Sequence, residues 1–175
     1  MTETIAQKFP MAGNVRESDR LLAVAGAGLA AAAIVAILRG SAHWGEVAPL
    51  VWLHLDSIVA ATSLTPVMLL RRKGNRRHRQ LGYAWVAAML LTALTSLFFN
   101  TRSPSGLGVF SGDFSPIHIL SGIVIVMVPR LVMHARAQNH RAHQRTVHGL
   151  VIGALLIAGF FTFRFDRMLG RWLFG

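Results

Sequence analysis

Apolar segments of about 20 residues, separated by short basic turns, most constrain what this chain can fold into. One apolar segment runs from Pro49 to Leu70; the basic stretch RRKGNRRHR follows at residues 71–79, and another apolar segment begins at Leu81. In an α-helix, about 20 residues rise about 30 Å, the thickness of a membrane's hydrocarbon core. Basic residues gathered between such segments are typical of the cytoplasmic side of a membrane. The sequence therefore predicts helices that cross a membrane, with residues 71–79 in the cytoplasm.

Five such segments are expected along the chain, so the prediction is an all-α integral membrane protein. A polar cytoplasmic tail at residues 1–19 precedes an additional N-terminal transmembrane helix at residues 20–39. Residues 49–175 are expected to form a four-helix transmembrane bundle, with spans at about 49–70, 81–99, 115–133 and 147–165. A cytoplasmic N-terminus then places both basic turns in the cytoplasm and the C-terminus on the outer side of a bacterial inner membrane.

Two groups of side chains suggest how the helices sit. The first segment carries small residues that let another helix approach closely: Ala23, Gly26, Ala27 and Ala30. Tyr83 and Trp85 follow a basic turn directly, so we expect both rings at the membrane interface.

Composition excludes several classes of function. The formal net charge is +11, but the basic residues cluster in turns beside apolar segments, which favours anionic lipid headgroups on the cytoplasmic side over nucleic acid. The chain has no cysteine, so disulfides, thiolate metal sites and iron–sulfur clusters are excluded. No hydrolase, transferase or nucleotide-binding motif is present, which leaves at most a redox component.

Several motifs resemble those of a known family. They are His54, Lys73-Gly74, the stretch HRQLGYAW at 78–85, the stretch FSPIHILS at 114–121, His143, and the stretch GALLIAGFFTF at 153–163. In these motifs the chain is similar, over about residues 50–175, to bacterial predicted inner-membrane proteins known as domain of unknown function number 2306. Three positions depart from the family pattern: Asn100, Gln144 and the stretch FDR at 165–167. The resemblance implies the four-helix core and brings no established activity.

The histidines suggest a function. His54 and His118 fall at one end of the predicted bundle, and His78 and His143 at the other, on alternating helices. Two-haem membrane cytochromes of the ascorbate-linked ferric-reductase type use a similar plan, in which each b-type haem bridges two histidines. We therefore predict a haem b electron carrier, with these four histidines as iron ligands. Basic side chains would neutralise the haem propionates: Arg76, Arg77, Arg79 and Arg141 on the inner side, and more weakly Arg102 outside.

Other interpretations stay open. The histidines can be purely structural, in a haem-free accessory subunit that packs against a larger respiratory or photosynthetic membrane complex. The last basic turn offers a separate set of ligands for Zn, Cu or Ni, namely His134, His140, His143 and His148. Asp56 is the one acidic residue well inside a predicted span, so it is a candidate for proton relay or small-molecule transport, or an interfacial residue.

Overall fold

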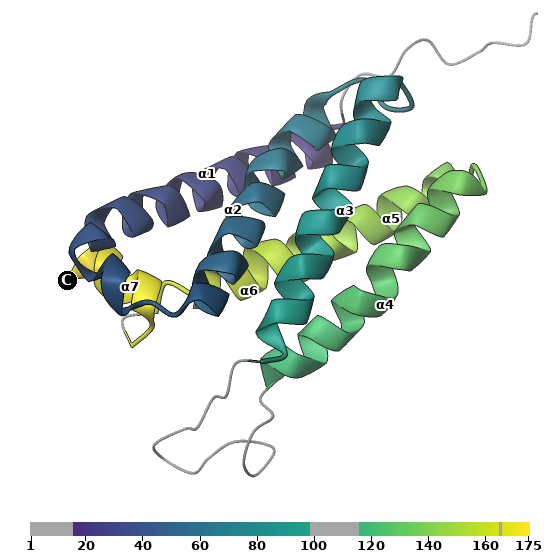
Figure 1. The fold of residues 1–175 in the computed structure, drawn as a ribbon. Helices are drawn as coiled ribbons and strands as arrows, with labels where there is room; N and C mark the ends of the chain where they lie inside the picture. The colour runs from purple at the N-terminus through teal and green to yellow at the C-terminus, as the bar shows by residue number, and fades with distance from the viewer. Residues whose placement is uncertain (1–15, 99–115, 165) are drawn as a thin grey trace, which may run out of the picture.

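The computed structural model describes residues 16–98, 116–164 and 166–175 (Figure 1). Helices dominate these ranges, and no strand occurs within them. The all-α prediction is therefore confirmed. The elements are α1 Glu17–Arg39, the 3₁₀ helix η1 Gly40–Glu46, α2 Pro49–Leu70, α3 Arg76–Ser96, α4 Pro116–Arg136, α5 His140–Leu150, the π-helix η2 Val151–Ile157, α6 Ala158–Phe161 and α7 Met168–Phe174.

Four helical stretches are long and apolar enough to cross a membrane, which supports the membrane prediction. They are Glu17–Glu46, Pro49–Leu70, His118–Arg136 and His140–Phe161. The last stretch is one continuous helix made of α5, η2 and α6. Helix α3, which contains most of the expected span at 81–99, is not among these stretches; its first turn carries three arginines, Arg76, Arg77 and Arg79.

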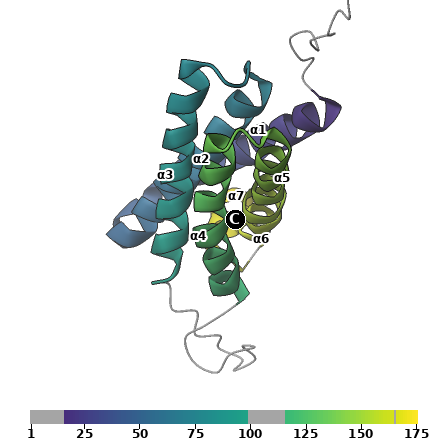
Figure 2. The ribbon, with the colours of Figure 1, turned by 90° about the vertical axis from the view of Figure 1, so that its right-hand side faces the viewer.

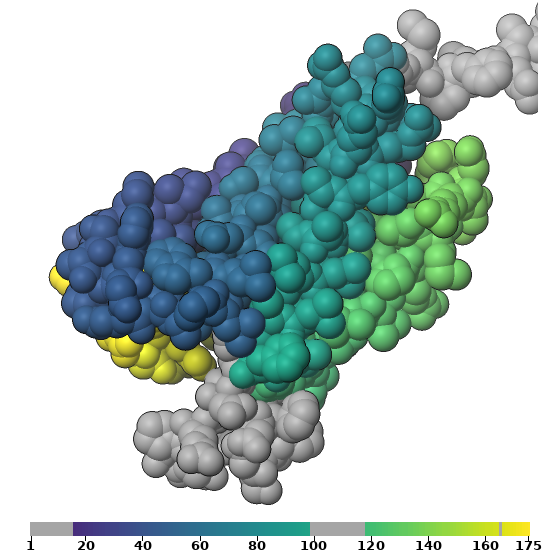
Figure 3. Space-filling view, in the orientation of Figure 1, coloured from purple at the N-terminus to yellow at the C-terminus, as the bar shows by residue number. Residues whose placement is uncertain are grey.

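The helices pack in a bundle in which chain neighbours are also neighbours in space. Helix α2 packs against both α1 and α3, α3 against α4, and α4 against α5, while α1 also contacts η2 and α7 (Figures 1 and 2). Figure 3 shows how closely the first three helices adjoin when their side chains are drawn in full. We call the end with the turns at 71–75 and 137–139 the basic end, and the end with η1 and α7 the far end. The contact between α1 and η2 ties the first helix directly to the last long one.

Asparagine caps extend two helices into the basic turns. The Asn75 side chain accepts a hydrogen bond from the His78 backbone N–H, so α3 begins at Arg76 and not at the expected residue 81. The Asn139 side chain caps α5 in the same way, which therefore begins at His140 rather than near 147. His78 and His143 consequently lie on first helical turns, where the backbone fixes the direction of each side chain.

The apolar core lies between α2, α3, α4 and the α5–η2 helix. Trp85 is 5% exposed and packs there with Met89, Val128 and Leu155. Its indole Nε1 donates a hydrogen bond of 2.9 Å to the Thr65 hydroxyl of α2. The ring of Trp85 is therefore buried between the helices, whereas the ring of Tyr83 is exposed on the outside of the bundle; their expected position at the membrane interface stays a prediction. The indole faces inward because a polar partner on the next helix satisfies its N–H.

The small residues of α1 do contact neighbouring helices, with one exception. Ala23, Gly26 and Ala30 are buried, while Ala27 is exposed. A Cβ atom on Gly26 would lie 3.6 Å from the Thr65 side chain, an ordinary van der Waals contact, so this face of α1 lies directly against α2. The prediction of close helix packing at this face is confirmed.

Candidate functional site

His54 lies inside the bundle at its far end, held by α3. Its ring Nδ1 is 3.1 Å from the backbone oxygen of Thr92 and 3.0 Å from the hydroxyl of Thr95. Because a carbonyl oxygen only accepts hydrogen bonds, Nδ1 carries the proton in the tautomer that bonds Thr92. The other nitrogen, Nε2, then has the lone pair, which is the arrangement found in metal-binding histidines.

Hydroxyl groups surround this histidine. The Thr92 hydroxyl lies 2.8 Å from that of Ser57, which donates to the His54 backbone oxygen. One turn further along α3, the hydroxyls of Ser96 and Ser121 are 2.6 Å apart and join α3 to α4. Sequence reasoning missed this polar network, although hydroxyl residues three or four apart on one helix were its signal.

A small cavity lies beside His54, between the helices of the bundle. Its volume is about 80 Å³, and α2, α3, α4 and the η2–α6 helix all contribute to its lining. His118 is 6% exposed on α4, one turn before Ser121, which lines the cavity. His54 and His118 therefore both lie within the far end of the bundle, as predicted from their order along the chain.

The wall of the cavity formed by the last long helix is π-helical. Residues Val151–Ile157 have this wider turn, and Ala154 and Ala158 line the cavity beside it. Short π-helical segments inside α-helices are frequent at functional sites because they re-aim the side chains of one turn. No feature of the sequence indicated this segment.

His78 and His143 lie near each other at the basic end. The ring Nδ1 of His143 is 3.1 Å from the backbone oxygen of Leu131 on α4. Nδ1 of His78 is buried and has no hydrogen-bond partner among the described residues. Burial lowers the pKa of His78 below its ordinary value, and the nearby charges of His143 and Lys73 lower it further. His78 therefore favours the neutral imidazole, the form that binds metals.

The remaining predicted site residues lie on the surface. Arg76, Arg77, Arg79 and Arg141 are exposed around the basic end, and none forms an ion pair within the described ranges. Asp56 is exposed on α2 and lines neither the cavity beside His54 nor the larger one beside α7. Arg102 and Asn100 lie outside the described residues.

The basic end contains an ionic cluster that the sequence analysis did not predict. Asp19, placed in the polar tail by the sequence analysis, is 0% exposed on the first turns of α1. Its two carboxylate oxygens lie 2.7 Å from Lys73 Nζ and 2.7 Å from His148 Nε2. Lys73 follows α2, whereas His148 belongs to α5. The carboxylate therefore joins three parts of the chain that are far apart in sequence.

This ionic cluster bears on the alternative metal site. His148 is engaged by Asp19, and His143 by the backbone of Leu131. Among the described residues, no group of three or more histidine or acidic side chains can hold a metal ion. The four histidines His134, His140, His143 and His148 therefore do not form such a group in this fold.

A comparison with known families agrees with this architecture. Residues 51–168 match the family model described as "Predicted membrane protein (DUF2306)". The chain belongs to this family. The matched DUF2306 segment runs from the first turn of α2 through α6 and contains His54, His78, His118 and His143, whereas α1 and Asp19 precede it. No curated protein and no solved structure matches the chain.

Proposed function

We propose that this DUF2306 protein is a b-type haem electron carrier, with His54 and His118 at one haem and His78 and His143 at another. One observation carries the proposal: at each end of the bundle, a histidine of the pair approaches a backbone carbonyl through Nδ1. Such a bond orients an imidazole and raises the basicity of Nε2 toward iron.

The donor set suits a haem with two imidazole ligands. An imidazole on each face of the iron gives a one-electron carrier, which is the chemistry that the haem supplies. His118 is buried in the bundle, and Arg76 and Arg79 are exposed in the same helical turn as His78, where their guanidinium groups would neutralise propionates.

Haem binding requires the far end of the bundle to open. The cavity beside His54 is about 80 Å³, whereas ligand pockets generally measure about 300–1,000 Å³. The contact between the hydroxyls of Ser96 and Ser121 crosses from α3 to α4 beside this cavity, so it is the contact we expect to separate.

The test is a reduced-minus-oxidised absorption spectrum of the detergent-purified chain, with pyridine haemochrome quantitation. We expect a sharp α-band, with about half of the haem lost in His54→Ala or His118→Ala and the other half in His78→Ala or His143→Ala. His140→Ala is the matched control, because His140 is exposed in the same helical turn as His143. Absence of a Soret band after expression with added haem precursor would refute the proposal.

The small size of the cavity favours a second function, that of a haem-free accessory subunit of a larger respiratory or photosynthetic membrane complex. Such a subunit needs an apolar surface, and α1 exposes Leu21, Val24 and Leu38 along its length. A colourless protein that comigrates with large membrane partners would support this function over the first.

For the orientation, we infer a bacterial inner membrane with the basic end in the cytoplasm. Arginine and lysine gather in the turn at 71–75 and on the helices beside the turn at 137–139, which favours the cytoplasmic side. The chain has no native cysteine, so a single cysteine at the exposed Gln138 tests the orientation. A thiol reagent that cannot cross membranes should label it only after the cells are opened; labelling of intact cells would reverse the orientation.

A further inference from the structure

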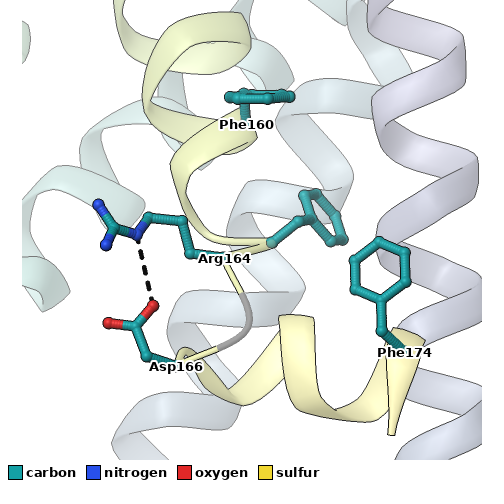
Figure 4. A pocket seen from close by; sticks show the side chains of 5 residues that line it. Phe160, Arg164, Asp166 and Phe174 are labelled. Carbon is teal, nitrogen blue, oxygen red and sulfur yellow. Dashed lines mark ion pairs between the residues drawn. The ribbon is translucent and has the colours of Figure 1, made fainter.

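A second cavity lies at the far end, between the end of the last long helix and α7. Its volume is about 550 Å³, within the range of ligand pockets (Figure 4). Three aromatic rings and one charged pair line it: Phe160, Phe163, Phe174, Arg164 and Asp166. It is separate from the cavity beside His54, which shares none of these residues.

The wall that α7 contributes is fixed in place. A side chain at Gly170 would collide with the backbone oxygen of Arg164, so glycine permits this close approach. At the other end of α7, Arg39 Nη1 donates a hydrogen bond of 2.6 Å to the backbone oxygen of Leu173. Phe174 follows directly, so its backbone is held by the contacts of α7 to the turn at Arg164 and to α1.

The lining presents an apolar surface with a cation at its edge. Phe160 is 71% exposed and Phe174 58%, and Phe160 lies in the last turn of a helix that is apolar enough to cross a membrane. In a bilayer these rings contact acyl chains. Figure 4 shows Arg164 extending away from the rings toward Asp166, 3.4 Å away. This ion pair is exposed at both partners, so it contributes little and leaves the guanidinium able to bind another anion.

The surroundings of the cavity favour an anion. Arg171 lies on α7 near Phe174, whereas Asp166 is the one acidic residue among the described residues of the lining. A molecule with apolar chains and a negatively charged head matches this combination of rings and arginines.

We propose that this cavity binds one phospholipid with an anionic headgroup. Its phosphate lies at Arg164, and an acyl chain lies along Phe160, Phe163 and Phe174. Asp166 competes with the lipid for the guanidinium and so limits the affinity. The site is independent of haem, since none of its residues belongs to the histidine pairs.

Native mass spectrometry of the detergent-purified full chain tests the site, with phosphatidylglycerol and phosphatidylcholine of identical acyl chains as probes. We expect one phosphatidylglycerol to bind about tenfold more tightly than phosphatidylcholine. Arg164→Gln should abolish this preference, and Asp166→Asn should increase it two- to fivefold. Arg167→Gln is the matched control: it removes the same charge three residues away without touching the lining, and should change the affinity less than twofold.

Three outcomes would overturn the proposal. Equal affinity for the two lipids would remove the role of the headgroup. Equal losses in Arg164→Gln and Arg167→Gln would indicate diffuse electrostatics in place of a site. Displacement of the lipid by a short-chain quinone at lower concentration would assign the cavity to a redox carrier. For each variant, the unfolding temperature without lipid is measured as a control; a value equal to that of the wild type shows that the fold is intact.

Discussion

Asp19→Asn is the sharpest test of how the first helix is attached. Asparagine keeps the size of the side chain and one carbonyl oxygen, but it replaces the second acceptor with an NH₂ group. In the wild type both carboxylate oxygens accept, one from Lys73 and one from His148. In the variant only one of the two partners meets an oxygen, and neither bond has the carboxylate's charge. An NH₂ group that faces Lys73 releases the ammonium, whereas one that faces His148 requires the imidazole to change tautomer.

The magnitude follows from the burial of the three groups. A hydrogen bond to a charged group contributes about 1.5–3 kcal/mol. The Asp19 side chain is 1% exposed, but that of Lys73 is 51% exposed, so the released ammonium is rehydrated and adds no large penalty. We therefore expect a loss of about 1.5–3 kcal/mol, the contribution of one such bond. At about 2–4 °C per kcal/mol for a chain of this size, the unfolding temperature falls by about 3–12 °C.

Thermal unfolding in detergent measures the loss, with Glu17→Gln as control. Glu17 is an exposed acidic residue in the same helical turn, so its neutralisation should change stability by less than about 0.5 kcal/mol. A double-mutant cycle adds Lys73→Met. When residue 19 is aspartate, this change leaves the buried carboxylate with one partner; once Asp19→Asn has removed the charge, the same change costs little. We expect a coupling energy of about 1–3 kcal/mol. Equal shifts in the Asp19 and Glu17 variants, or additive effects in the cycle, would refute the reasoning.

Two further variants test other buried polar groups. The pKa of His78 is lowered by burial from its ordinary value of 6.5, so as pH falls below 6.5 the unfolded chain binds a proton that the folded chain resists. The wild type should therefore lose stability as the pH falls through about 6.5, and the His78→Gln variant should lose less. The control is His140→Gln at an exposed site; if the unfolding free energies of the two variants change equally with pH, the prediction is contradicted. Thr65→Val removes the acceptor of the Trp85 indole and strands a buried N–H, which should lower the unfolding free energy by about 1–3 kcal/mol. If Trp85→Phe lowers the stability of the Thr65→Val variant by as much as it lowers that of the wild type, the hydrogen bond between the two side chains contributes nothing.

Much of the fold could be predicted from where apolar segments begin and end. The segment from Pro49 to Leu70 is a helix with those very bounds, because proline starts it and Arg71 ends the apolar run. The basic turns were harder. Because asparagine caps start the helices inside these stretches, His78 lies on the first turn of α3 and not in a loop before it.

The site could be predicted only as far as the ends of helices. Sequence order places His54 and His118 together at one end, since alternating helices run in opposite directions. It does not fix how far each helix is rotated about its axis, which depends on packing with its neighbours. The bond from His54 to Thr92, the hydroxyl network and the inward turn of Trp85 all depend on that rotation. The π-helical turn likewise arises within an apolar run that has no local signal for it.

Asp19 shows why the first helix belongs to the fold, although the family match begins after it. A carboxylate with no exposure to solvent needs its partners, and both partners lie inside the matched segment. At the far end of the same helix, Arg39 bonds the backbone of α7 at Leu173, which follows the matched segment. Helix α1 is therefore held at both ends by polar contacts, and small residues bring its middle against α2. An appended anchor would need only the apolar contacts, so the charged contacts at both ends indicate a helix that fixes how the bundle is closed.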